Sequence, residues 1–373
     1  MLIRFDEYLI HQTPEPLAHP VSADRNFYDR YWLSGFDAEA GLYFALGLGL
    51  YPHRQVMDAA FSTVLGGEQR VSFASRRAHP AAREDTRVGP IRIEVLEPMR
   101  RLRLSVAPND SGLEAELIYS ARSACVEEDR QILRSGAAAS MDVTRFTQFG
   151  CWEGVLRIDG RELQLSPAHT HGIRDRSWGV RAVGESPGGA PMRPPSVFFL
   201  WSQVFWDDEA TSATVFEDPT GYPLHAGASV VPLHAADGDW PVLADPAQRR
   251  FHGVSHQLRY VSGTRRAGGG SLSLLEPGGR LRRIEMQPLL RFQMKGAGYH
   301  HPAWKHGKWK GEEAAGSERW TLAELSPLAP ENLHIQQVVQ CTDGTRHGIG
   351  VLEQMCFGPH EPSGLKGMFD GAE

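Results

Sequence analysis

The sequence has 373 residues, of which 41% are hydrophobic and 23% charged, as in an ordinary folded protein of about two domains. A net charge of −6 gives no overall basic field, so we expect no nucleic-acid partner. The 39 glycines and 25 prolines favour short strands and tight turns over long helices.

Targeting and membrane segments are not evident in this composition. Residues 1–12 carry charges and lack the apolar segment of a signal peptide. The longest apolar run, residues 41–51, is shorter than the ~20 residues that a membrane span needs. The four cysteines have no C-x-x-C spacing, so we expect reduced thiols. The sequence therefore predicts a cytoplasmic protein without stable membrane insertion, and it leaves a homodimer open.

Strand patterns fill the first half of the chain. Short helical turns are predicted only over residues 25–34 and 80–85. The expected strands alternate with turns rich in Gly, Pro, Asn and Asp. These strands cover residues 42–51, 58–65, 69–75, 92–96, 101–107, 113–120, 144–152, 154–158 and 161–165.

A Gly- and Pro-rich connection over residues 185–195 separates the two halves. We place the domain division there, which gives domains 1–184 and 185–373. The strands expected after the connection cover residues 197–205, 211–216, 256–261, 271–275, 281–290 and 338–340. The predicted fold class is therefore all-β, with few short helices, in two consecutive antiparallel barrels or sandwiches.

Residues 171–181, HGIRDRSWGVR, concentrate polar and aromatic side chains in a segment that is also predicted to be a strand. On a strand, odd-numbered positions from 169 to 179 share one face and even-numbered positions from 174 to 180 share the other. Asp175 and His171 are then candidate acid and base in one cavity. Burial raises the pKa of a carboxyl group, whereas neighbouring arginines lower it. The alternative is a structural Asp–Arg pair that joins the domains, with Trp178 in the core.

Two further patterns indicate ligand chemistry. His169 and His171 have the spacing of two metal ligands on one strand face, which makes a metal-dependent enzyme an alternative. Aromatic residues are abundant in the second half, and they predict either an apolar pocket or core packing. Our preferred interpretation uses neither a metal ion nor a cofactor.

The stretch from Arg174 to Gly179 resembles the His-Asp-His-Asn-Trp-Gly motif of the carotenoid 1,2-hydratase (hydroxyneurosporene synthase) superfamily. The run from Phe27 to Gln69 is similar to uncharacterised bacterial members of that superfamily. The resemblance implies two lipocalin-like β-barrels, with an apolar small molecule in a barrel or at their junction. It also implies proton-initiated hydration or cyclisation of an isoprenoid double bond, or a pericyclic ring closure. Arg176 stands where the hydratase has a histidine, and a guanidinium does not release its proton at neutral pH.

We therefore expect a protein that binds and transforms a terpenoid, steroid or polyketide-like molecule by acid-assisted hydration, isomerisation or cyclisation. The catalytic candidates are Asp175, His171 and Arg176. The substrate-binding candidates are Trp178, Trp201, Arg174, Gln203, Phe205 and Tyr299. A non-catalytic carrier of hydrophobic ligands is the alternative, beside the metal-dependent enzyme that would use His169 and His171.

Overall fold

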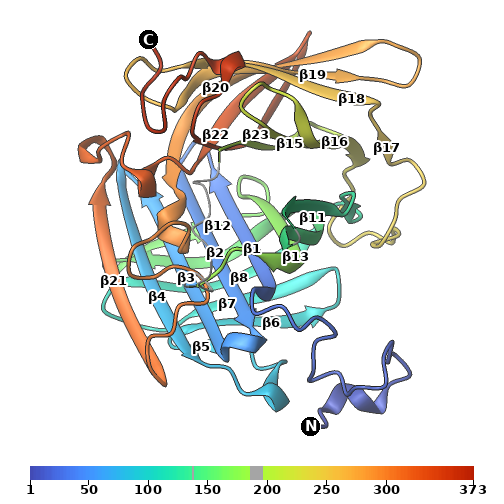
Figure 1. Cartoon of the computed structure of the whole chain (residues 1–373), viewed down its shortest axis with the longest axis vertical. Helices are drawn as coiled ribbons and strands as arrows, with labels where there is room; N and C mark the ends of the chain where they lie inside the picture. Colours follow the sequence, from blue (N-terminus) through green and yellow to red (C-terminus); the bar gives the residue numbers. More distant parts are fainter. Residues whose placement is uncertain (137, 185–195) are drawn as a thin grey trace.

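The computed structural model describes residues 1–136, 138–184 and 196–373, so the predicted connection over residues 185–195 lies outside the described residues. Within these ranges, the strands form two antiparallel sheets and the helical segments are short 3-10 turns (Figure 1). The all-β class predicted from the sequence is confirmed. No helix in the described ranges is long and apolar enough to cross a membrane.

The larger sheet has 14 strands among the residues described. Its main path runs β21-β4-β3-β2-β1-β13-β11-β8-β7-β6-β5, and β9, β10 and β12 also pair with β11. Figure 1 shows β21, in orange, beside β4 at one edge, although the two strands are far apart in sequence. The strands are β1 (Phe27–Asp37), β2 (Leu42–Tyr51), β3 (Val56–Leu65), β4 (Glu68–Arg77), β5 (Arg87–Val88), β6 (Ile91–Glu97), β7 (Arg101–Val106), β8 (Leu113–Ala121), β9 (Val126–Glu127), β10 (Gln131–Ser135), β11 (Ala138–Ile158), β12 (Arg161–Leu165), β13 (His171–Arg181) and β21 (Glu313–Thr321).

The smaller sheet has nine strands in the same described ranges, in the order β17-β16-β15-β14-β23-β22-β20-β19-β18. They are β14 (Val197–Phe205), β15 (Glu209–Glu217), β16 (Pro223–Pro232), β17 (Arg249–Arg250), β18 (Gly253–Tyr260), β19 (Ala267–Leu275), β20 (Leu281–Gln293), β22 (Ile335–Asp343) and β23 (Arg346–Phe357). The 3-10 turns are η1 (Arg4–Glu7), η2 (Pro52–Arg54), η3 (Pro80–Ala82), η4 (Met294–Ala297), η5 (Leu322–Glu324), η6 (Pro330–Asn332) and η7 (Glu361–Ser363).

Most predicted strands are present, and β2, β12 and β14 have the predicted bounds. The helical turn predicted over residues 25–34 is wrong, because β1 occupies most of that range. β1 pairs with β2 on one side and β13 on the other, and this pairing suits its aromatic residues. The turn predicted at residues 80–85 is confirmed as η3.

The two strands predicted over residues 144–152 and 154–158 are one long strand, β11. Gly154 interrupts the sequence pattern without ending the strand. Its φ of 121° lies in the region that favours glycine, and a Cβ there would collide with the carbonyl oxygen of Glu116 on β8. Glycine therefore lets β11 continue past its neighbour.

An apolar cluster fills the junction between the two sheets. Trp32 and Phe36 of the larger sheet and Trp201 and Phe205 of the smaller sheet belong to this one cluster. Phe149 on β11 packs edge-to-face on Phe205, with ring centroids 5.0 Å apart. Other clusters lie within the larger sheet and within the smaller sheet. Apolar side chains from both halves of the chain therefore meet at the junction.

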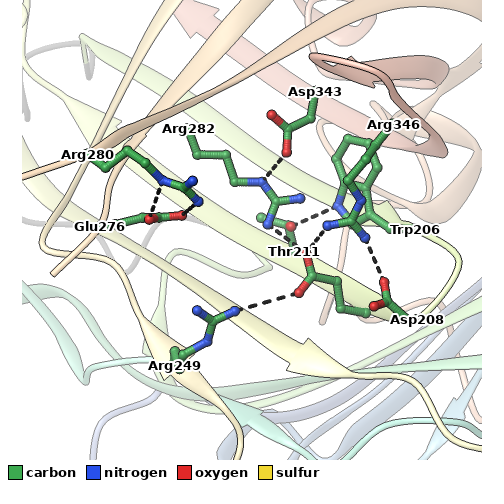
Figure 2. Close-up of polar contacts among 10 residues, drawn as sticks. Trp206, Asp208, Thr211, Arg249, Glu276, Arg280, Arg282, Asp343 and Arg346 are labelled. Atoms are coloured by element: carbon green, nitrogen blue, oxygen red, sulfur yellow. Dashed lines mark hydrogen bonds and ion pairs between the residues drawn. The ribbon is translucent and has the colours of Figure 1, made fainter. Parts of the chain in front are cut away.

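An ion-pair network joins strand ends of the smaller sheet (Figure 2). The Arg282 side chain on β20 is only 7% exposed, and its nitrogens lie 2.6 Å from Asp343 and 2.8 Å from Glu209. Glu209 also pairs with Arg346 at 2.7 Å, and both guanidinium groups lie over the ring of Trp206. The positive charges have acidic partners, so this network holds β15, β20, β22 and β23 together.

Candidate functional site

Strand β13 divides its side chains between two environments. Ile173 packs in the junction between the sheets, and Asp175 lies on the same face. On the opposite face, Arg176 lies over Tyr31 and Trp178 packs near Phe146. The odd–even division predicted for this segment is therefore present from His171 onward.

Asp175 lies in a row of side chains across three strands of the larger sheet. It is directly opposite Thr147 on β11 and Trp32 on β1. The smaller sheet carries a similar row, in which Trp201 on β14 is opposite Thr214 on β15 and Glu353 on β23. Trp32 and Trp201 pack in the same junction cluster. The two rows therefore contribute polar groups to an otherwise apolar junction.

Arg145 on β11 is the cation that lies near Asp175. Arg145 Nε is 3.5 Å from Asp175 Oδ2, and Arg145 Nη1 is 3.3 Å from Glu128 Oε2. Burial raises the pKa of Asp175 to about 7, since it outweighs the opposing effect of the Arg145 charge. The negative charges of Glu128 and Glu353 raise this pKa further. Asp175 can therefore both hold and release a proton near neutral pH.

Several buried polar atoms of the junction have no hydrogen-bond partner among the described residues. Leaving a buried donor or acceptor unpaired costs about 1–3 kcal/mol, so such atoms are unusual in a purely structural core. These atoms are Trp32 Nε1, Thr147 Oγ1, Trp201 Nε1, Thr214 Oγ1 and both side-chain polar atoms of Gln203. Two indole donors, two hydroxyls and an amide thus belong to the rows of Asp175 and Trp201 or to the next position on the same face of β14.

A pocket of about 240 Å³ lies beside this site. Its lining includes Glu128 from the larger sheet's side and Thr214 and His225 from β15 and β16. Glu128 pairs with Arg145, which in turn lies near Asp175, and burial lowers the pKa of His225. The pocket therefore shares Thr214 with the polar rows and Glu128 with the ion pairs next to Asp175.

A histidine–glutamate pair on the smaller sheet belongs to the same junction and was not among the sequence candidates. His334 Nε2 lies 2.6 Å from Glu353 Oε1, and both side chains are nearly buried. Gln336 donates to the other Glu353 oxygen, and Tyr43 of the larger sheet donates to Gln336. No motif marks these residues, because they meet only through strand pairing of β22 with β23 and contact between the sheets.

The other predicted site residues are distributed around the junction. His171 stacks on Phe36 and lies 4.7 Å, ring to ring, from Phe205, at the start of β13. Burial lowers the pKa of His171 to about 4. No described contact joins His171 to Asp175. The Tyr299 ring packs against Trp32 and His334, near the polar rows.

Arg174, Arg176 and Trp178 lie on the face of β13 that points away from Asp175. Arg174 contacts Gln148 and Phe146, and Trp178 is 38% exposed. Asp175, Trp201 and Gln203 therefore lie on the junction faces of their strands, whereas Arg174, Arg176 and Trp178 lie on the opposite face of β13.

The spacing of His169 and His171 was expected to put both rings on one strand face. His169 instead lies in an exposed turn before β13, so that part of the prediction is wrong. Within the described ranges, no group of three or more His, Cys, Asp or Glu side chains is arranged to hold a metal ion. The donor set that the metal-dependent alternative requires is not found there.

A family model matches residues 2–366 of the chain. The protein belongs to a family of unknown function, DUF8625. A comparison with curated proteins finds no match. Among the solved structures that share the fold of this DUF8625 member, two are 14% identical to it in sequence.

One is a Nitrosomonas europaea protein with a provisional assignment as AttH, at a TM-score of 0.54. It covers 88% of this chain and 92% of its own. The other is kievitone hydratase from Nectria haematococca, at a TM-score of 0.53, covering 88% of each chain. At this identity the likeness shows the shared fold alone, which confirms the predicted lipocalin-like architecture. Neither structure is a carotenoid 1,2-hydratase, so that resemblance stays a prediction.

Proposed function

We propose that this DUF8625 member binds a largely apolar small molecule at the sheet junction and transforms it by acid-assisted hydration or the reverse elimination. The observation that carries the proposal is that a buried, protonatable Asp175 and several unpaired polar atoms lie on the strand faces that form an aromatic junction. The hydratase activity named for the Nectria protein of the same fold agrees with this proposal.

The ligand's chemistry follows from the groups of the junction. Trp32, Trp201, Phe199 and Phe205 suit an apolar or aromatic frame. The indole N–H groups of Trp32 and Trp201 can only donate, so they suit ligand oxygens such as carbonyl or hydroxyl groups. Gln203 supplies both a donor and an acceptor. An oxygen-bearing polyketide, terpenoid or steroid therefore suits this set better than a plain hydrocarbon.

The chemistry follows from the state of Asp175. In its protonated form it would donate a proton to one carbon of a double bond, which leaves a cationic centre at the neighbouring carbon. The faces of nearby indoles would stabilise that cation. A water molecule would add its oxygen there and lose a proton, and the Asp175 carboxylate would recover one. A pKa near 7 suits both proton steps at neutral pH.

His334, held by Glu353, would assist by accepting the proton that the added water loses and passing it to the Asp175 carboxylate, so that the proton given to the double bond is replaced. A histidine held by a carboxylate is oriented for proton transfer. His334 Nδ1 is buried and has no partner among the residues described, so it is the atom that can take part. The catalytic roles predicted for His171 and Arg176 stay predictions.

The first test identifies the ligand and then removes the acid. Compounds that co-purify with the protein are extracted and identified by mass spectrometry, and then assayed for conversion. Asp175→Asn should lower kcat about 10²–10⁴-fold, because general acid catalysis is lost, while ligand affinity changes little. Arg157→Met, which removes an exposed ion pair with Glu162, is the matched control and should leave both unchanged.

The outcomes separate the alternatives. Binding without conversion by the native protein supports a carrier, and retained conversion by Asp175→Asn contradicts the role of that residue. A metal that co-purifies, with activity lost on chelation, supports the metal-dependent alternative.

A further inference from the structure

Arg174 is a buried cation without an acidic partner. It is 4% exposed, and no carboxylate among the residues described lies within ion-pair distance of it. Its one hydrogen bond is long, with Arg174 Nη1 3.5 Å from Gln148 Oε1, and its Nε has no described partner. The Phe146 ring lies 5.5 Å from its guanidinium carbon. An uncompensated buried charge is among the least favourable features of a folded protein.

Arg176, two residues further along β13, increases this positive charge. Its side chain is 17% exposed, and its Nη1 is buried without a hydrogen-bond partner in the described ranges. Asp29 lies 2.8 Å from Arg176, but the same carboxylate is also 4.0 Å from Arg83. Among the residues described, Arg176 and Arg83 therefore share the Asp29 carboxylate, and Arg174 has no ion pair.

The neighbours of Arg174 supply dipoles and rings rather than negative charge. Tyr119 donates its hydroxyl hydrogen to the Gln148 carbonyl, and Tyr31 lies against Arg176. Burial lowers the pKa of Arg174, and the nearby Arg176 charge lowers it further. This face also remains accessible at one end, because Trp178 is 38% exposed.

We propose that Arg174 and Arg176 form an oxyanion-binding site inside the N-terminal half, on the face of β13 opposite Asp175. The ligand is a carboxylate or a phosphate, whose paired oxygens match the planar fork of a guanidinium. The site is independent of the proposed chemistry at Asp175, because the backbone of β13 lies between the two.

The proposal makes two linked statements about stability. Bound oxyanion neutralises the Arg174 charge, so it stabilises the folded state by mass action. Without oxyanion, a well-packed Met in place of Arg174 removes an uncompensated charge, so Arg174→Met should be at least as stable as the native protein. A purely structural arginine predicts the opposite, a marked loss of stability in Arg174→Met.

The test is thermal unfolding of the full chain in sodium phosphate and in sodium acetate, each compared with sodium chloride at equal ionic strength. We expect phosphate or acetate to raise the Tm of the native protein by about 2–5 °C. The shift should persist in Asp175→Asn and in the control Arg157→Met, and it should disappear in Arg174→Met. Comparison of the two salts tells which head group the site prefers.

Three results would overturn the proposal. These are no shift in the native protein, an equal shift in Arg174→Met, or a Tm of Arg174→Met well below that of the native protein in chloride. An equal shift would indicate the general stabilising effect of such salts. Failure of Arg174→Met to fold counts with the third of these results. Arg174→Lys is a second variant that keeps the charge but loses the fork, and the anion shift must fall in it as well. If the anion-induced rise in Tm persists in Asp175→Asn, the oxyanion site does not depend on the residue proposed for the reaction.

Discussion

Asp175 and Arg174 are adjacent in sequence, yet strand alternation places them in different parts of the molecule. Asp175 faces the sheet junction, where burial and two acidic neighbours favour its neutral form. Arg174 faces the interior of the N-terminal half and has no ion pair among the described residues, whereas Arg176 on the same face pairs with Asp29. The polar run 171–181 therefore faces two different environments on one strand, rather than forming one cluster.

The raised pKa of Asp175 predicts a specific pH dependence of stability. Its pKa is 3.8 in a model peptide and about 7 in the folded protein. Between about pH 4 and pH 7 the folded state holds a proton that the unfolded state has released, so stability falls as the pH rises. The loss of stability that comes from ionising the buried Asp175 is absent below about pH 4 and fully present above about pH 7.

Asp175→Asn removes this dependence, since the amide does not titrate. We expect the unfolding free energy of Asp175→Asn, minus that of the native protein, to increase from pH 5 to pH 7 by at most about 1.4 kcal/mol per pH unit. Urea unfolding at pH 5, 6, 7 and 8 measures it, and other titrating groups cancel in the difference. A difference that is constant with pH, or that decreases, would show that Asp175 is ionised throughout.

At the scale of elements, sequence pattern predicted strands well where both hydrophobicity and turns mark them. β14 is bounded by charged residues and by a connection rich in Gly and Pro, and β12 follows an Asp-Gly turn. β1 was mistaken for a helical turn, because pairing on both sides decides its conformation. β21 has a polar, Ala- and Gly-containing sequence, and pairing with β4 at a sheet edge makes it a strand.

The residues of the candidate site also fall into those that the sequence could predict and those that it could not. Asp175, Trp201 and Gln203 could be proposed from one strand pattern and one family motif. His334 and Glu353 could not, because neither has a local signature and their contact needs two strands to pair. The lack of an ion pair for Arg174 could not be predicted either. It depends on which acidic residues of other strands face the same side of β13, and no local sequence pattern contains that information.

The ion-pair network of the smaller sheet gives a prediction about its elements (Figure 2). Glu209 accepts ion pairs from Arg282 and Arg346, and Arg282 is nearly buried. Glu209→Gln should lower the free energy of unfolding by about 1–3 kcal/mol, because part of the buried Arg282 charge loses its partner. Urea unfolding measures this change.

Glu276→Gln is the matched control, because its partner Arg280 is drawn in the same view but has a side chain that is 78% exposed, whereas that of Arg282 is 7% exposed. This substitution should change stability little. Equal effects of the two variants would contradict a supporting role for the buried part of the network.

At the scale of the whole molecule, the two halves of the chain share both a sheet and a core. β21 comes from the second half but extends the sheet of the first, next to β4. The junction cluster takes Trp32, Phe36 and Phe149 from the first half and Trp201 and Phe205 from the second. The domain division at residues 184 and 185, the homodimer and the cytoplasmic location stay predictions, and β21 crosses that division.

This sharing predicts that residues 1–184 do not form a stable domain alone. Without the second half, β4 becomes an unpaired edge, and the aromatic face that includes Trp32 and Phe149 is exposed to water. We expect the fragment to aggregate, or to bind a hydrophobic dye and unfold without a cooperative transition, whereas the full chain unfolds cooperatively. Circular dichroism with thermal and urea unfolding of both proteins measures this. A soluble fragment with a sharp transition would show that the first half is an independent domain, and that β21 and the junction cluster add stability without being required for folding.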